Sequence, residues 1–360
     1  MKPQRYEVDT GLFYCPIQSA VHPRVGDVAE RSLAWITKFG LSADDRQRKR
    51  LMATNSAEFY GRITPEGLED RLQIAADWCY WGFAFDDAWS YEGETTRHPD
   101  DLLALVGRLL RILQTLDARL CGNDPFLVAL HDIAVRLSAG STPVQMRQWV
   151  ESHRLWLLGM AQRANFTARG IIPTLDAYLT MRLHDCGGAP CTAMIGIVDG
   201  VEVPCHEIDS PAVRALTEVA WMTAALDNER VSHAKEVHGE AQVKNLVDVL
   251  MHERACSAQE ALSTLVVMRD RMMCLFLRLR EQTIPTASPI LRRYLTDLGH
   301  MIAGNIEWSL GTARYTTVYG DAAVPIGSVS LSTGWVLEPA DDLCEPLPFP
   351  SISWWWEQLH

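Results

Sequence analysis

Apolar residues at helical spacing run through most of this chain and constrain its fold more than any other feature. Between residues 101 and 120, Leu and Val recur every three or four positions, which is the period of one helix face. Residues 68–85 become apolar on nearly every side, as expected for a helix buried in a large bundle. This pattern predicts helices over residues 68–85, 101–120, 144–166, 175–183, 211–236, 242–252, 258–281 and 289–315.

Local signals agree with a helical chain. Ser257 and Glu260 form a capping-box pattern that predicts a helix start at Ala258. No segment alternates apolar and polar residues well enough to predict a sheet. We therefore predict an all-α, single-domain antiparallel bundle over residues 13–319. It would follow an N-terminal segment, residues 1–12, that could be flexible, and precede an irregular tail, residues 320–360.

The tail contains three consecutive tryptophans, Trp354, Trp355 and Trp356. Exposing so much aromatic surface is unfavourable, so we expect this segment to pack on the body of the protein or on a partner chain. The sequence leaves both a monomer and a homodimer open.

The composition excludes several classes of partner. The chain has 360 residues, 48% of them hydrophobic, and a net charge of −12. Such a chain can bury a large core, and its charge repels nucleic acid and anionic membranes, so we expect neither as a partner. The N-terminus lacks the apolar core of a signal peptide, and no run of eighteen apolar residues occurs. We therefore expect a cytoplasmic protein.

The cysteines support that location. Nine cysteines, an odd number without framework spacing, indicate reduced thiols. Cys186 and Cys191, with Cys205 and His206 further on, could be imagined as a zinc site. Their spacing does not match the common zinc patterns, so structural thiols are the preferred interpretation.

The strongest chemical signal is Asn228, Ser232 and Glu236, spaced at i, i+4 and i+8. These positions share one helix face and offer an amide, a hydroxyl and a carboxylate oxygen. Oxygen ligands of this kind suit Mg²⁺, which completes its coordination with water and substrate phosphate. Lys235 lies beside the last of them. Taken alone, such a triplet is more often a solvated helix face. The choice between that interpretation and a metal site therefore depends on the other motifs of the chain.

A pair of carboxylates, Asp86 and Asp87, closes the apolar helix predicted over residues 68–85. Acidic residues are unfavourable near a helix C-terminus, where the helix dipole is negative. A divalent cation would compensate them. The alternative is a helix end that simply meets water.

Two further motifs contain positively charged arginine side chains. Arg182 lies in a predicted helix that Gly187 and Gly188 interrupt, and Arg314 is followed by Tyr315. The planar guanidinium of arginine suits phosphate oxygens, and a tyrosine hydroxyl adds a donor.

Together these motifs resemble the bacterial class I terpene synthases. Asp86-Asp87 looks like that family's aspartate-rich motif, and Asn228, Ser232 and Glu236 match its Asn-x-x-x-Ser-x-x-x-Glu motif. Arg182 stands 46 residues before Asn228, at the position of the family's diphosphate-sensing arginine, and Arg314-Tyr315 matches its C-terminal pair. His22-Pro23, Trp35 and the tryptophans before Asp86 are also similar to the family. The likeness covers residues 13–319.

The resemblance implies a fold and a reaction. The helices would surround a central apolar pocket, and three Mg²⁺ ions would be held by Asp86, with Asp87 as the next candidate, and by the Asn228 triplet. Arg182, Lys235, Arg314 and Tyr315 would bind the diphosphate of a linear prenyl diphosphate. Farnesyl diphosphate is slightly favoured over geranylgeranyl diphosphate as the commoner substrate in the family. Ionisation would give an allylic carbocation that cyclises to a terpene.

Two positions depart from the family's pattern. The third acid of its aspartate-rich motif is often five residues after the first, where this chain has Tyr91, with Glu92 one further on. The family also follows its sensor arginine with a linker aspartate and an effector residue, frequently glycine. Those positions are Asp185 and Cys186 here.

Aromatic faces can stabilise a carbocation by cation–π contact. We expect Phe59, Phe83, Trp221 and Trp308 to line the pocket, although ordinary core packing is about as frequent for any one of them.

Two other functions are alternatives to a cyclase. A chain-elongating prenyltransferase of the same fold would need a second aspartate-rich motif, where this chain has Asn228, Ser232 and Glu236. The third possibility is a non-catalytic helical binding protein, and ligands retained in both motifs argue against it.

Overall fold

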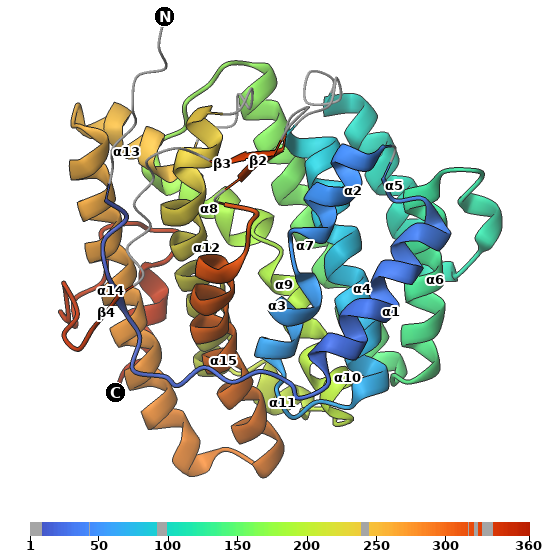
Figure 1. Cartoon of the computed structure of the whole chain (residues 1–360). Helices are drawn as coiled ribbons and strands as arrows, with labels where there is room; N and C mark the ends of the chain where they lie inside the picture. Colours follow the sequence, from blue (N-terminus) through green and yellow to red (C-terminus); the bar gives the residue numbers. More distant parts are fainter. Residues whose placement is uncertain are drawn as a thin grey trace, which may run out of the picture. The chain divides into compact units, whose positions relative to one another are not determined.

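The computed structural model describes residues 9–42, 44–91, 99–238, 245–315, 317–319, 323–325 and 334–360. The α-helices are α1 Val25–Phe39, α2 Asp45–Met52, α3 Ser56–Ile63, α4 Glu69–Asp86, α5 Pro99–Thr115, α6 Pro125–Ala139, α7 Pro143–Ala168, α8 Leu175–Asp185, α9 Gly188–Ala193, α10 Ile195–Asp199, α11 Cys205–Ile208, α12 Pro211–His238, α13 Leu246–Arg254, α14 Ala258–Thr283 and α15 Pro289–Gly311 (Figure 1). The predicted all-α class is confirmed.

Shorter elements complete the chain. A π-helical turn, η1 Asp87–Tyr91, continues α4, and three 3₁₀ turns are η3 Ala118–Leu120, η4 Ile284–Thr286 and η5 Ser353–Gln358. The strands pair two by two: β1 Phe13–Tyr14 runs parallel to β4 Trp335–Val336, and β2 Thr317–Tyr319 runs antiparallel to β3 Ala323–Pro325.

For the described helices, the predicted starts agree with the structure better than the predicted ends. Ser257 and Glu260 do form the capping box that starts α14. The helix predicted to Leu120 is wrong at its end, because α5 stops at Thr115 and Leu116 adopts a left-handed backbone with φ 53°. The helix predicted to Tyr315 stops at Gly311, because Thr312 is extended with ψ 140°. Helices α1, α2, α3, α6, α9, α10 and α11 were not predicted.

The chain divides into two compact units. The first contains Met1–Ser19, Ile171–Leu183 and Cys205–His360, and the second contains Ala20–Gly170 and His184–Pro204. The predicted boundaries at residues 12 and 319 stay predictions.

In the first unit, α12 packs against both α14 and α15. A buried charge network lies on α12 and α14, where Asp227 pairs with Arg230 at 3.3 Å and with Arg269 at 2.9 Å. The Nη2 atom of Arg230 donates to the carbonyls of Thr10, Gly11 and Leu12 at 2.8 to 3.0 Å. This network anchors the N-terminal segment to α12.

The C-terminal tail packs on the same unit. Trp355 is fully buried, and its Nε1 donates to Glu218 of α12 at 2.8 Å. Ser351 Oγ donates to Asp176 of α8 at 2.6 Å. Of the two alternatives for the tryptophan segment, the structure has it packed on its own chain.

In the second unit, α4 packs against α1, α3 and α6, and α7 packs against α5 and α9. The indole Nε1 of Trp78 donates to His153 Nε2 at 2.8 Å, and His153 Nδ1 lies 2.8 Å from the carbonyl of Trp149. Burial lowers the pKa of His153 to about 4. This imidazole is therefore neutral at pH 7, with its proton on Nδ1.

Within the described part of the chain, none of the helices combines the length and the apolar character needed to cross a membrane.

Candidate active site

Helix α12 carries Asn228, Ser232 and Glu236, as the sequence predicts. Two of these side chains contact a residue that was not predicted, Asn245. Asn245 caps α13, and its Nδ2 donates to Glu236 Oε2 at 2.8 Å and lies 3.4 Å from Ser232 Oγ. The oxygens of Ser232 and Glu236 therefore converge on one point. The Asn245-x-x-Asp248 capping box was a signal that could have identified Asn245 as a helix cap.

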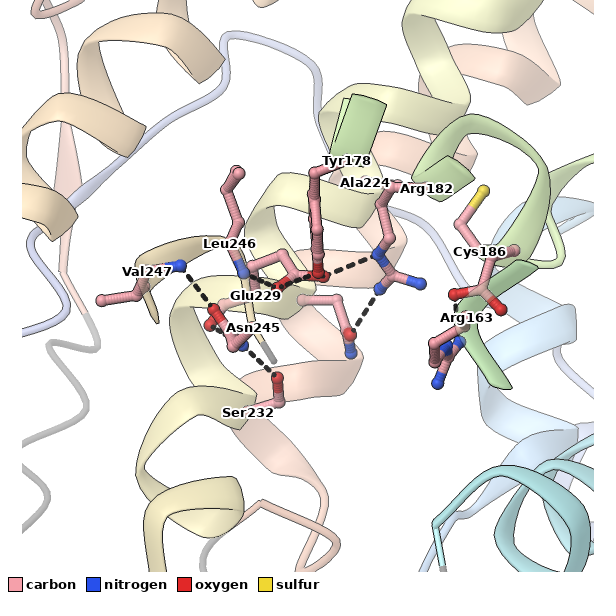
Figure 2. A network of polar contacts seen from close by, with 12 residues as sticks. Arg163, Tyr178, Arg182, Cys186, Ala224, Glu229, Ser232, Asn245, Leu246 and Val247 are labelled. Carbon is pink, nitrogen blue, oxygen red and sulfur yellow. Dashed lines mark hydrogen bonds and ion pairs between the residues drawn. The ribbon is translucent and has the colours of Figure 1, made fainter. Parts of the chain in front are cut away.

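Arg182 joins the first member of the triplet. Its Nη2 donates to Asn228 Oδ1 at 3.0 Å, and its Nε lies 2.6 Å from Glu229 Oε1 (Figure 2). Arg182 and Asn228 are predicted site residues. Glu229 is not, because it directly follows Asn228 and falls outside the four-residue spacing of the motif.

Glu229 is buried and tightly held. Its carboxylate accepts from the hydroxyl of Tyr178 at 3.0 and 3.1 Å and from the backbone nitrogen of Leu246 at 2.8 Å (Figure 2). Burial raises the pKa of Glu229, and the adjacent Arg182 opposes that shift. Glu229 thus fixes the orientation of the arginine through a charged contact.

Tyr315 contacts the amide nitrogen of Asn228, whose amide oxygen contacts Arg182. The Nδ2 atom of Asn228 donates to the Tyr315 hydroxyl at 2.6 Å. Burial raises the pKa of Tyr315 to about 12, so this hydroxyl keeps its proton near neutral pH. The ring packs edge-on against Trp308, with centroids 5.7 Å apart. Arg314 is buried beside it, in the turn that follows α15.

In the second unit, the carboxylates at the end of α4 are compensated by arginines. Arg50 binds Asp87 through two contacts of 3.1 Å, and Arg163 Nη1 lies 4.0 Å from Asp86 Oδ1. These guanidinium groups offset the unfavourable position of two acids at a helix C-terminus. Neither arginine stood out in the sequence, because both are distant from the aspartates along the chain.

Of the remaining predicted site residues, some are described by the structure and others are not. Phe59 and Phe83 contact each other edge-on at 6.2 Å, and Asp185 ion-pairs with Arg163. Cys186 lies in the turn before α9, where its sulfur accepts from the backbone nitrogen of Gly188 at 3.4 Å, and Trp221 is half-buried on α12. The side chains of Lys235 and Tyr91, and the whole of Glu92, lie outside the described residues.

The donor set on α12 fits a hard divalent cation. An amide, a hydroxyl and a carboxylate oxygen share one face, and two of them already converge on a single amide group of Asn245. A cation bound through Asn228 Oδ1 would share that oxygen with Arg182, which an amide oxygen with two lone pairs permits. Among the described residues no cluster of three or more His, Cys, Asp or Glu forms a metal site, so this fit depends on Asn228 and Ser232.

Known proteins match this chain over nearly its whole length. A family model described as terpene synthase family 2, C-terminal metal binding, matches residues 77–274. Spiroviolene synthase of Streptomyces violens is 38% identical over 98% of this chain and 97% of its own. Phomopsene synthase of Allokutzneria albata is 36% identical, over 95% of each chain.

A solved structure agrees with these sequences. The crystal structure of a protein from ancestral sequence reconstruction superimposes with a TM-score of 0.86 at 42% identity. The match covers 96% of this chain and 98% of that one. This chain therefore belongs to the family of bacterial class I terpene synthases.

Proposed function

We propose that this terpene cyclase ionises a linear prenyl diphosphate with the help of Mg²⁺ and cyclises the resulting carbocation. The observation that carries the proposal is the chain of contacts from Arg182 through Asn228 to Tyr315. It joins α8, α12 and the turn after α15, and its members match three separate family motifs. A solvated helix face would not link them.

The proposed metal ligands are Asp86, with Asp87 next, and Asn228, Ser232 and Glu236. Bound there, Mg²⁺ would supply Lewis-acid stabilisation of the leaving diphosphate, and three ions are expected by analogy with the family. The carboxylate of Asp87 forms an ion pair with Arg50, so it would have to give up this contact to bind metal. The side chain of Asp86 is the more exposed of the two, at 19% against 13% for Asp87.

The proposed diphosphate contacts are Arg182, Lys235, Arg314 and Tyr315. Diphosphate oxygens form charge-assisted hydrogen bonds with a guanidinium, so they can compete with Glu229 for Arg182. The Tyr315 hydroxyl can donate to an oxygen because its proton is retained. These groups stabilise the negative charge that develops on the leaving group.

Loss of diphosphate leaves an allylic carbocation that must be kept from water. We propose that Phe59, Phe83, Trp221 and Trp308 stabilise it through their ring faces. Asp185 and the backbone carbonyl of Cys186 would act on the substrate side of the sensor arginine, by analogy with the family.

Farnesyl diphosphate is the first candidate substrate. One relative, 31% identical, is named T-muurolol synthase, (2E,6E)-farnesyl diphosphate cyclizing, of Streptomyces clavuligerus. A twenty-carbon diphosphate is the second candidate, because a relative of 32% identity from Streptomyces sp. is named a diterpene cyclase.

The test is product analysis by gas chromatography and mass spectrometry after incubation with ten-, fifteen- and twenty-carbon diphosphates and Mg²⁺. We expect a cyclic terpene from one of the two longer substrates, and none after chelation with EDTA or in Asn228→Ala. A parallel incubation with isopentenyl diphosphate separates elongation from cyclisation. Longer prenyl chains, or full product yield from Asn228→Ala, would overturn the proposal.

A further inference from the structure

Arg163, on α7, joins two acidic groups that come from different helices. Its side chain is only 8% exposed and ion-pairs with Asp185, the last residue of α8 (Figure 2). The other guanidinium nitrogen, Nη1, lies 4.0 Å from Asp86 Oδ1 at the end of α4. A buried guanidinium is costly unless it is paired, and both carboxylates lie within ion-pair distance of Arg163.

Gly159 lies one helical turn before Arg163 and provides an independent contact with the same aspartate. A Cβ atom at Gly159 would lie 2.5 Å from the backbone nitrogen of Asp185 and 2.9 Å from its Cα. Both of those atoms belong to backbone, which cannot rotate out of the way. Only glycine at this position allows α7 and the end of α8 to approach so closely.

The two contacts fix the turn that follows Asp185. Cys186 comes next, Gly187 has a left-handed backbone with φ 72°, and α9 begins at Gly188. Arg163 forms an ion pair with the side chain of Asp185 at the start of this turn, and Gly159 packs against the backbone of Asp185. The same guanidinium faces Asp86, so any change in the charge around Asp86 alters the field at the arginine that holds the turn.

We propose that Arg163, supported by Gly159, is a positioning residue that sets the Asp185-Cys186 turn and links it to Asp86. The inference rests on the proposed function, in which Asp86 binds metal and the turn faces substrate. Arg163 acts through Asp185 and Asp86 and does not itself touch the substrate. Its replacement should therefore affect turnover and product distribution more than substrate affinity.

The first experiment compares Arg163→Gln, Arg163→Lys and the double variant Arg163→Gln/Asp185→Asn with wild type. We expect Arg163→Gln to lower kcat at least 100-fold with KM changed less than fivefold, and to lower the Tm measured without metal. The double variant also neutralises the buried carboxylate that faces Arg163 and should recover most of the Tm; because Asp185 belongs to the proposed site, this variant is used for stability alone. Arg163→Lys should recover part of kcat, because it keeps the charge without the fork. Arg154→Gln, an exposed arginine of α7 paired with Glu151, is the matched control and should retain kcat.

The second experiment tests the backbone contact with Gly159→Ala. We expect at least a tenfold loss of kcat and an altered ratio of products. Gly107→Ala is the control, because a Cβ at that helical position of α5 meets nothing within 4 Å.

The inference is overturned if Arg163→Gln lowers the Tm but keeps wild-type kcat, since Arg163 would then be only structural. It is also overturned if Arg163→Gln and Gly159→Ala both turn over normally. Failure of the proposed function is a different result, because wild type itself would then form no product. The coupling of Arg163 and Asp185 in the metal-free Tm would still be measurable in that case.

Discussion

The side-chain amide of Asn228 donates a hydrogen bond of 2.6 Å to the hydroxyl of Tyr315, 87 residues further along the chain. This contact links the metal-ligand motif of α12 to the turn after α15. It also fixes the rotamer of Asn228, since the amide oxygen on the other side accepts from Arg182 at 3.0 Å. The orientation of one proposed metal ligand thus depends on two proposed diphosphate-binding residues.

Tyr315→Phe should separate this hydrogen bond from packing. The phenylalanine ring can keep its contact with Trp308, whereas the amide of Asn228 loses a buried acceptor, at a cost of about 1–3 kcal/mol. The same free energy lost from transition-state stabilisation lowers kcat/KM by about 5- to 160-fold. Steady-state kinetics on the accepted diphosphate measures it. Tyr294→Phe removes another tyrosine hydroxyl, one that lies 3.1 Å from Thr217, and should have little effect on turnover. Equal kinetic losses in the two variants would contradict the assignment.

Glu229→Gln should destabilise the metal-free protein. The variant removes the charge of Glu229 from its ion pair with the buried guanidinium of Arg182, for which we expect a loss of about 3 kcal/mol or more in unfolding free energy. Urea unfolding at pH 7.5 provides the measurement. Glu151→Gln breaks an exposed ion pair with Arg154 and should cost no more than about 1 kcal/mol. A loss at Glu229 as small as that at Glu151 would mean that the buried pair does not hold Arg182.

His153 should make the protein less stable in mild acid. Its pKa in the folded protein is lowered to about 4 from the usual 6.5, so the unfolded chain binds more protons between these values. This contribution to stability is complete above pH 6.5 and is lost as the pH falls toward 4. At pH 5 the loss is about 2 kcal/mol.

The variant His153→Gln isolates this effect from that of other groups. Urea unfolding of both proteins at pH 7.5 and pH 5.0 gives the difference between their pH responses. We expect wild type to lose about 2 kcal/mol more than the variant on acidification. Identical pH responses would exclude His153 as the titrating group.

Trp355→Ala should destabilise the first unit. It removes a fully buried indole and its hydrogen bond to Glu218, with an expected loss of about 3–5 kcal/mol in unfolding free energy. Thermal unfolding followed by circular dichroism measures the change. Trp354→Ala removes a half-buried neighbour and should cost clearly less. Similar losses in the two variants would show that the fully buried indole has no special role in holding the tail.

Local sequence patterns predicted the parts of the site that depend on helix geometry. The face shared by Asn228, Ser232 and Glu236 follows from a spacing of four residues, and α12 has it. The start of α14 follows in the same way from Ser257 and Glu260. Helix ends were harder to predict, because the apolar period continues past Thr115 although Leu116 leaves the helical conformation.

Contacts between distant segments were beyond the sequence. Glu229 looked like a spacer within the motif, and its partners Tyr178 and Arg182 come from another helix. Asn245 became part of the site through packing, as did Arg163. A single sequence carries the periodicity of each helix but not the pairing of one helix with another.

The anchoring of the N-terminal segment by Arg230 has a consequence for synthesis. The carbonyl of Thr10 accepts hydrogen bonds from a side chain 220 residues further along the chain. A ribosome at about 5–20 residues per second takes on the order of 10–40 seconds to cover that distance. Residues 10–12 therefore wait for the synthesis of α12 before they can dock through Arg230.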